Sequence, residues 1–185
     1  MTLNLLRQRL RGPKAGDLLS KLYGSDSQMA EKQITRYIQA TVRFCELFPQ
    51  HINEEFFIFS TPGRTEIGGN HTDHNAGRVL AAGISLDAIA VVTRSQDSVI
   101  TVYSEGYPEP FIVGLENLHP VPEEEGTTAA LIRGIAGRIK ESGYEIGGFN
   151  AYITSDVLGG SGLSSSACIE ILLGTIMNHP YNEGK

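Results

Sequence analysis

The sequence predicts an α+β domain in which a mixed sheet is covered by helices. Three observations lead to this prediction. Helical periodicity dominates the first fifty-five residues, several short apolar segments typical of strands follow, and helix and strand patterns then alternate. The chain has 185 residues, of which 41% are hydrophobic, so it can bury a real core. We expect residues 1–55 to form a helical lead-in and residues 56–185 to form the α+β part.

The helical lead-in is predicted from apolar spacing and from helix-ending residues. Leu3, Leu6 and Leu10 share one face of a first helix, and Gly12-Pro13 interrupts it. The run Ser25-Asp26-Ser27-Gln28 has the spacing of a capping box. After it, apolar side chains recur at steps of three and four until Pro49 ends the helix. These side chains are Ile34, Ile38, Val42, Cys45 and Phe48.

Short apolar segments after the lead-in indicate strands. They lie at residues 56–59, 88–93, 99–103 and 111–113. The segment Pro120–Gly126 carries prolines and glutamates, and we expect it to be an exposed connection.

A helix and a last strand follow that connection. Leu131, Ile135 and Ile139 mark a helix that stops near Gly143. Residues 149–154 then alternate large apolar side chains with smaller or polar ones, which is typical of a half-buried strand.

A glycine-serine run, Gly159–Ala167, lies between this strand and a helix whose apolar face carries Ile169, Leu172 and Ile176. Backbone N–H groups and the positive end of the helix dipole meet at such a junction, and together they favour an anion such as phosphate. The alternative is a flexible surface loop, or a helix capped by serine. No Gly-Lys-[Ser/Thr] follows the glycines, so the run is not a Walker A motif, and its spacing is not that of the dinucleotide fingerprint.

A second polar segment, Thr61–Asn75, lies between the first two strands as an expected loop. Arg64 offers a rigid fork of donors suited to phosphate or to polarised oxygens. The segment also contains acceptors and groups that can donate or accept: Glu66, Asn70, His71, Asp73 and His74. A sugar presents adjacent hydroxyls that both donate and accept, so this set of groups matches a sugar.

Two alternatives remain for that segment. His71-Thr72-Asp73-His74 could ligate zinc or manganese, although the histidines lack the i, i+4 spacing of zinc motifs on helices. The segment could instead be a solvated loop held by Asx turns and by a pair between Arg64 and Asp73 or Glu66. The glycine-serine run in the same domain makes the solvated loop less favoured.

Composition excludes several classes of protein. The net charge of −6 argues against a general nucleic-acid binder. No apolar stretch approaches the length of a membrane span. Met1–Arg11 lacks the continuous apolar run of a secretory signal and favours an amphipathic first helix. Cys45 and Cys168 both lie in expected helices with apolar neighbours, so we interpret them as reduced core residues of a cytoplasmic protein.

Together the two polar segments resemble the galactokinase branch of the kinases named for galactose, homoserine, mevalonate and phosphomevalonate. The first motif of that family runs Pro-Gly-Arg-Val-Asn-Leu-Ile-Gly-Glu-His-Thr-Asp-Tyr, which Pro62-Gly63-Arg64, Gly69 and His71-Thr72-Asp73 match in register. Its phosphate loop, Gly-Leu-Ser-Ser-Ser-Ala, is found at Gly162–Ala167. The N-terminal helices carry no part of either motif.

The resemblance implies an ATP-dependent sugar 1-kinase that transfers the γ-phosphoryl group of ATP to the C1 hydroxyl of galactose. Asn70, His71 and Asp73 would bind the sugar, and Arg64 would lie near the anomeric oxygen and the transferring group. Ser166 would help to hold Mg²⁺. The ATP phosphates would be bound by Gly160, Gly162, Ser164, Ser165 and Ser166.

The chain departs from the family pattern at three positions. Asn70 replaces the usual sugar-binding Glu, Glu66 replaces Asn, and His74 replaces Tyr. Asn70 can accept a hydrogen bond from a hydroxyl but brings no charge, so the motif specifies the reaction class more closely than the sugar.

In the family, an acidic catalytic base and a whole second domain lie beyond the phosphate loop, whereas this chain stops at Lys185. We therefore expect residues 1–185 to be an N-terminal kinase domain that lacks its C-terminal domain and is inactive alone. Such a piece should expose apolar surface where the other half would pack. The alternatives are a non-catalytic galactose- and ATP-binding sensor, or a kinase for a non-sugar alcohol, which His71-Thr72-Asp73 disfavours.

Overall fold

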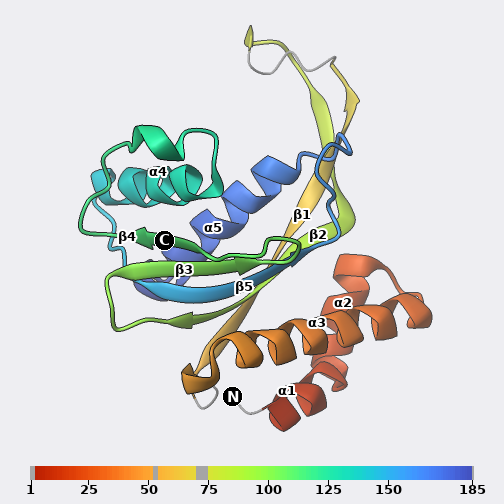
Figure 1. Ribbon diagram of the computed structural model, residues 1–185. Coiled ribbons are helices and arrows are strands. Elements are labelled where there is room, and N and C mark those ends of the chain that lie inside the picture. Colours follow the sequence, from red (N-terminus) through yellow and green to blue (C-terminus); the bar gives the residue numbers. More distant parts are fainter. Residues whose placement is uncertain (1–2, 52–53, 70–74, 185) are drawn as a thin grey trace.

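The computed structural model describes residues 3–51, 54–69 and 75–184. Three helices come first, then four strands, and then a helix, a strand and a final helix (Figure 1). The helices are α1 (Leu3–Leu10), α2 (Pro13–Tyr23), α3 (Ser27–Leu47), α4 (Thr128–Glu141) and α5 (Ser165–Asn182). The strands are β1 (Phe56–Gly68), β2 (Leu80–Arg94), β3 (Val99–Ser104), β4 (Phe111–Gly114) and β5 (Phe149–Ser155). Short 3₁₀ turns occupy Pro49–His51 and Pro122–Glu124.

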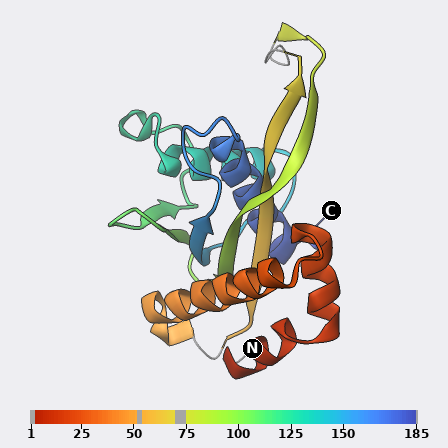
Figure 2. The same ribbon diagram turned by 90° about the vertical axis from the view of Figure 1, so that its right-hand side faces the viewer.

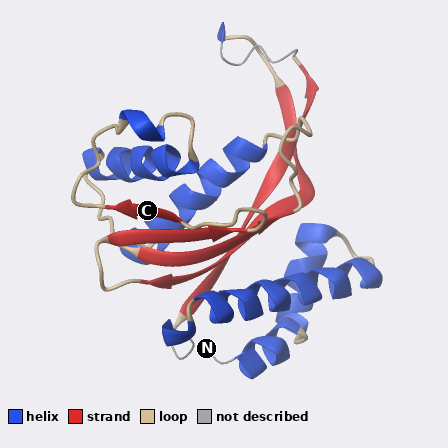
Figure 3. Cartoon of the chain, in the orientation of Figure 1, coloured by secondary structure: helices blue, strands red, loops and turns tan. Residues whose placement is uncertain are grey.

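The strands form one mixed sheet, as predicted. Their spatial order is β1-β2-β5-β3-β4, and β5 runs parallel to β3 while the other neighbours are antiparallel (Figure 3). The connection between β3 and β5 passes through β4 and α4. The carboxyl ends of β3 and β5 therefore lie side by side at the same end of the sheet.

Helices cover both faces of the sheet, and β2 shows how its side chains divide between them. Ala88, Ala90 and Val92 are buried in a core with α4 and α5. The alternate side chains Ile89 and Val91 are buried against α1, α2 and α3 (Figure 2). This alternation places the pleated strand between two apolar layers.

The expectation that the last strand is half-buried is wrong. In β5, every residue from Phe149 to Ile153 is buried. The small residue Ala151 faces α4 and α5, whereas Tyr152 faces the N-terminal helices. Because the N-terminal helices cover the second face, the alternating pattern here reflects two different packing partners and not one solvated face.

The N-terminal helices α2 and α3 begin close to the residues at which the sequence predicts one helix to end and another to begin. The N-cap of α3 is Asp26 and not Ser25, and its carboxylate accepts a hydrogen bond from the Gln28 amide at 2.8 Å. Pro13 begins α2, where its missing N–H costs nothing.

The buried face of α3 is centred on Ile34, Tyr37 and Phe44. The predicted apolar stripe is therefore wrong in its middle part, because Ile38, Val42 and Cys45 are only half-buried.

The segment Thr61–Gly68 was expected to be a loop, and that expectation is wrong because it continues β1. It pairs with β2 in antiparallel register, with shifts between Pro62 and Arg64 and between Glu66 and Gly68. The far halves of β1 and β2 form a two-stranded ribbon that extends away from the other elements (Figures 1 and 2).

A polar cluster is buried between the sheet and the N-terminal helices. The carboxylate of Asp87, in β2, accepts hydrogen bonds from the Tyr23 hydroxyl, the Ser60 hydroxyl and Arg36 Nη1, each at 2.5 Å. Arg36 Nη2 donates to the Asp87 carbonyl at 2.8 Å. Burial and the hydrogen bond to Asp87 raise the pKa of Tyr23 far above its ordinary value. The cluster ties α2, α3, β1 and β2 together.

Cys45 and Cys168 are both free thiols, and Cys168 is buried. Within residues 3–51, 54–69 and 75–184, we find no helix with the length and apolar character needed to cross a membrane.

Candidate functional site

The glycine-serine run forms a tight loop between β5 and α5. Gly160, Gly162 and Ser164 have positive φ values of 74°, 75° and 60°. The two glycines adopt this left-handed conformation at little cost, whereas Ser164 carries a Cβ that disfavours it. Strained residues of this kind gather at ligand clamps and active sites.

The N-terminus of α5 is not capped by a side chain. Ser164 is the N-cap residue, and its hydroxyl makes no capping hydrogen bond. The Ser161 hydroxyl also turns away from the helix and donates to the Leu158 carbonyl at 2.6 Å. The alternative of a serine-capped helix is therefore wrong. Among the described residues no side chain is seen to cap α5, so its first-turn N–H groups are open to a ligand or solvent, as in anion sites at helix N-termini.

β1 lies directly beside this loop. The Arg64 amide donates to the Leu163 carbonyl at 3.2 Å, and the Cys168 thiol donates to the Thr61 carbonyl at 3.1 Å. A Cβ placed on Gly63 would lie 3.1 Å from the Leu163 carbonyl oxygen and 3.0 Å from Val157 Cγ2. Glycine at position 63 thus lets the two segments approach closely, although about a hundred residues separate them in the sequence.

A cavity of about 580 Å³ opens beside the loop, at the carboxyl ends of β3 and β5. This size suits a cofactor-sized ligand, and ligands often bind outside the carboxyl ends of parallel strands. The cavity is lined by Ser104–Tyr107, Gly126–Thr128, Leu131, Ser155, Val157–Gly159, Ser165, Ser166 and Ile169.

Some of these lining residues carried no signal in the sequence. Tyr107, 58% exposed, packs edge-on against Phe111 with ring centroids 5.3 Å apart. Glu105 accepts a hydrogen bond from the Thr154 hydroxyl. Thr127 is the N-cap of α4 and accepts from the Ala130 amide at 3.3 Å. They come from turns after β3 and before α4, which only the fold brings to the glycine-serine loop.

The structure brings part of the predicted site together. Ser165 and Ser166 lie on the cavity wall, and the Ser166 side chain is exposed. Gly160, Gly162 and Ser164 lie in the same loop but do not line the cavity.

Of the residues predicted to act on the sugar, the structure describes Arg64 and none of those predicted to bind it. Arg64 is an exposed residue of β1, with its amide on the loop. The predicted residues Asn70, His71 and Asp73 lie outside the described residues, as does the alternative metal site at 71–74.

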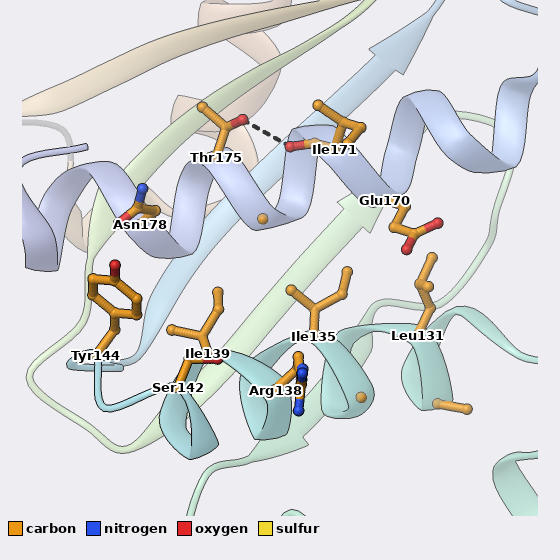
Figure 4. A pocket seen from close by; sticks show the side chains of 13 residues that line it. Leu131, Ile135, Arg138, Ile139, Ser142, Tyr144, Glu170, Ile171, Thr175 and Asn178 are labelled. Atoms are coloured by element: carbon orange, nitrogen blue, oxygen red, sulfur yellow. Dashed lines mark hydrogen bonds between the residues drawn. The ribbon is translucent and has the colours of Figure 1, made fainter. Parts of the chain in front are cut away.

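A second, more apolar hollow of about 710 Å³ runs between α4 and α5 (Figure 4). Leu131, Ile135 and Ile139 point from α4 toward α5, and Ile171 of α5 is 60% exposed. Arg138 and Glu170 are the charged residues of its lining. None of its described lining residues belongs to β1 or to the glycine-serine loop, and it has the character of a packing surface.

Comparison with known proteins agrees with this geometry. A family profile described as "Galactokinase galactose-binding signature" matches residues 43–94, which include Arg64. The chain is 34% identical over 145 residues to the galactokinase of Lacticaseibacillus paracasei, covering 78% of this chain and 37% of that protein. It is 32% identical over 144 residues to the galactokinase of Lactococcus lactis, covering 77% of this chain and 35% of that protein.

Solved structures are also similar to this chain. The crystal structure of Lactococcus lactis galactokinase complexed with galactose superposes with a TM-score of 0.67 at 31% identity, covering 75% of this chain and 35% of that one. Methanococcus jannaschii mevalonate kinase shares the fold, with a TM-score of 0.58 at 20% identity over 70% of this chain and 42% of that one. The chain spans just over a third of the length of the curated galactokinases that it matches.

Proposed function

We propose that this chain, which is similar to the N-terminal part of galactokinases, forms the sugar- and phosphate-binding half of a galactokinase-like enzyme. The reaction would transfer the γ-phosphoryl group of ATP to the C1 hydroxyl of galactose. The observation that supports it most directly is the backbone hydrogen bond from Arg64 to Leu163, at 3.2 Å. It joins the strand that carries part of the galactose signature to the glycine-serine loop, so the proposed donor and acceptor sites would be neighbours, as phosphoryl transfer requires.

For the nucleotide, we propose that the triphosphate lies along the loop and that the nucleoside occupies the adjoining cavity. The uncapped N-terminus of α5 supplies N–H groups and a favourable dipole to phosphate oxygens. The exposed hydroxyls of Tyr107 and Ser166 are available on the cavity wall. The loop contains no lysine, so phosphate binding would depend on the positions of the backbone amides.

For the metal, the chain offers an oxygen ligand suited to Mg²⁺, the hydroxyl of Ser166. Ser166 presents an exposed hydroxyl oxygen at the start of α5, and Mg²⁺ is usually bound by few protein oxygens together with substrate phosphates and water. When bound, Mg²⁺ would neutralise charge on the transferring phosphoryl group. We assign no acidic Mg²⁺ ligand and no catalytic base within this chain.

For the sugar, we propose that Asn70, His71 and Asp73 hydrogen-bond the galactose hydroxyls and that Arg64 polarises the reacting oxygens. Arg64 suits this role because it stands where β1 passes the phosphate loop. Asn70 in place of a carboxylate would weaken one hydroxyl contact without removing it.

We further propose that activity requires a longer polypeptide, whose additional domain packs on this one. The apolar hollow between α4 and α5 and the exposed Ile171 offer a surface for such packing. This chain alone would then bind ligands but turn over little ATP. Free thiols at Cys45 and Cys168 and the use of ATP are consistent with a cytoplasmic enzyme.

The direct test is to incubate the full-length protein with ATP, Mg²⁺ and galactose and to follow the products by ³¹P NMR. A new sugar 1-phosphate resonance, dependent on galactose, is expected. ADP release without a sugar phosphate, or no reaction with any hexose, would contradict the proposal. The second candidate, a sensor that binds both ligands without transfer, is favoured only by Asn70 and Glu66. It predicts calorimetric binding of galactose and ATP without the new resonance.

We expect Asp73→Ala to abolish galactose binding, because the substitution removes a charged acceptor for sugar hydroxyls. Isothermal titration calorimetry of the full-length protein would measure it, with ATP affinity as the internal control. Asp97→Ala is the control, because it removes an aspartate side chain from the turn before β3 and should leave galactose affinity unchanged. Unchanged galactose affinity in Asp73→Ala would remove this residue from the site.

A further inference from the structure

We propose that Arg36, on α3, positions the start of the phosphate loop through Asp156, so that the N-terminal helical layer controls nucleotide binding. This inference rests on the proposed function of the loop. Arg36 touches neither substrate in the proposed arrangement, because it lies on the face of the sheet opposite to α4 and α5. It is therefore a positioning residue and not a catalytic one.

Asp156 stands where β5 ends and the loop begins. Its amide donates to the Asp87 carbonyl at 2.9 Å, and its carboxylate lies 3.5 Å from Arg36 Nη1. The next residue, Val157, is buried and is one of the side chains that face Gly63 and line the 580 Å³ cavity. A shift of Asp156 would therefore be transmitted directly to the cavity wall.

Arg36 is fixed by groups other than Asp156. Nη1 lies 2.5 Å from the Asp87 carboxylate, and Nη2 lies 2.8 Å from the Asp87 carbonyl. The Arg36 side chain is only 11% exposed and that of Asp87 only 4%, so this pair is shielded from solvent. Asp156, at 34% exposed, is the most exposed of the three, and the rigid guanidinium fork limits where its carboxylate can lie.

The far end of the loop has its own anchor, in the bond between the Arg64 amide and the Leu163 carbonyl. Between the two anchors lie the glycines of positive φ, Gly160 and Gly162, which permit many conformations. Phosphate binding through backbone amides requires one of these conformations. Restricting both ends lowers the entropy lost when the nucleotide binds.

The test is Asp156→Asn in the full-length protein, which keeps the size of the side chain and removes its charge. We expect the KM for ATP to rise about three- to tenfold, as for loss of a partly exposed charge pair, while the KM for galactose and kcat stay within about twofold. Glu46→Gln is the matched control, because Glu46 lies on the same helix, ten residues after Arg36, and pairs there with Arg43 at 2.8 Å. Asp156→Glu should restore most of the ATP affinity.

A second variant and a second measurement guard against a folding defect. Arg36→Lys keeps the charge but cannot reach both carboxylates, so it should also raise the KM for ATP. Hydrogen exchange of peptides covering residues 156–164 should accelerate in both variants, while β2 peptides keep their protection. An ATP KM in Asp156→Asn equal to that of Glu46→Gln, with unchanged exchange, would overturn the inference. A wild-type protein that does not use ATP would instead overturn the proposed function, and this inference with it.

Discussion

Replacing Arg64 with alanine is expected to lower kcat of the full-length protein by about 100- to 1000-fold. In the proposed arrangement the guanidinium group lies where the phosphoryl group leaves ATP and approaches the sugar oxygen. Charge develops there in the transition state, and a fixed cation stabilises it more than it stabilises the bound substrates. The backbone of Arg64 is already held by Leu163, so truncating the side chain leaves the strand in place. Steady-state kinetics with saturating ATP and galactose would measure the loss.

Three comparisons make this result specific. Arg64→Lys keeps a charge but loses the planar fork, so its kcat should lie between those of alanine and wild type. Arg43→Ala removes an exposed arginine from α3 and should leave kcat within about twofold. The free energy of unfolding of Arg64→Ala should change little, because the side chain is exposed. A kcat near the wild-type value in Arg64→Ala would exclude the role proposed for this residue.

Asp87→Ala is expected to have the largest effect on stability, lowering the free energy of unfolding by about 3–5 kcal/mol. The substitution leaves the guanidinium of Arg36 buried without its main counter-charge. It also removes the acceptor for the hydroxyls of Tyr23 and Ser60. Urea unfolding followed by circular dichroism would measure the change.

Smaller changes in the same cluster should have graded effects. Ser60→Ala removes one donor and leaves the charge pair intact, so it should cost about 1 kcal/mol. Glu46→Gln, on the solvent-exposed side of α3, should cost at most about 0.5 kcal/mol. If Asp87→Ala cost no more than Ser60→Ala, the cluster would not be what joins the N-terminal helices to the sheet.

The elements with strong local patterns could be predicted from the sequence. The mixed sheet and the apolar face of α5 are confirmed, because burial there follows the spacing of apolar residues. The strand state of Thr61–Gly68 could not be predicted. Pro62 and Gly63 are poor strand formers, and this stretch is extended because β2 pairs with it across the ribbon.

The glycines of Gly159–Ala167 located the loop in the sequence, but they did not indicate which residues surround it. Several of those residues come from turns after β3 and before α4, which only the fold brings beside the loop.

The Asp87 cluster escaped the sequence analysis because its members lie far apart in the chain. Arg36 and Tyr23 are 51 and 64 residues away from Asp87. The one available signal is that Asp87 directly precedes the apolar run at residues 88–93, since an unpaired carboxylate is rarely buried in such a strand.

The ribbon formed by β1 and β2 has a consequence for how such a protein diversifies. Its base, at Thr61–Arg64, is held by hydrogen bonds to Leu163 and Cys168, whereas its outer part extends away from the other elements (Figures 1 and 2). In the proposed arrangement, mutations or insertions at the outer end of the ribbon would alter the choice of acceptor and leave the phosphate loop between β5 and α5 unchanged. Exchange of ribbon tips between homologues would then be a direct way to change acceptor selectivity.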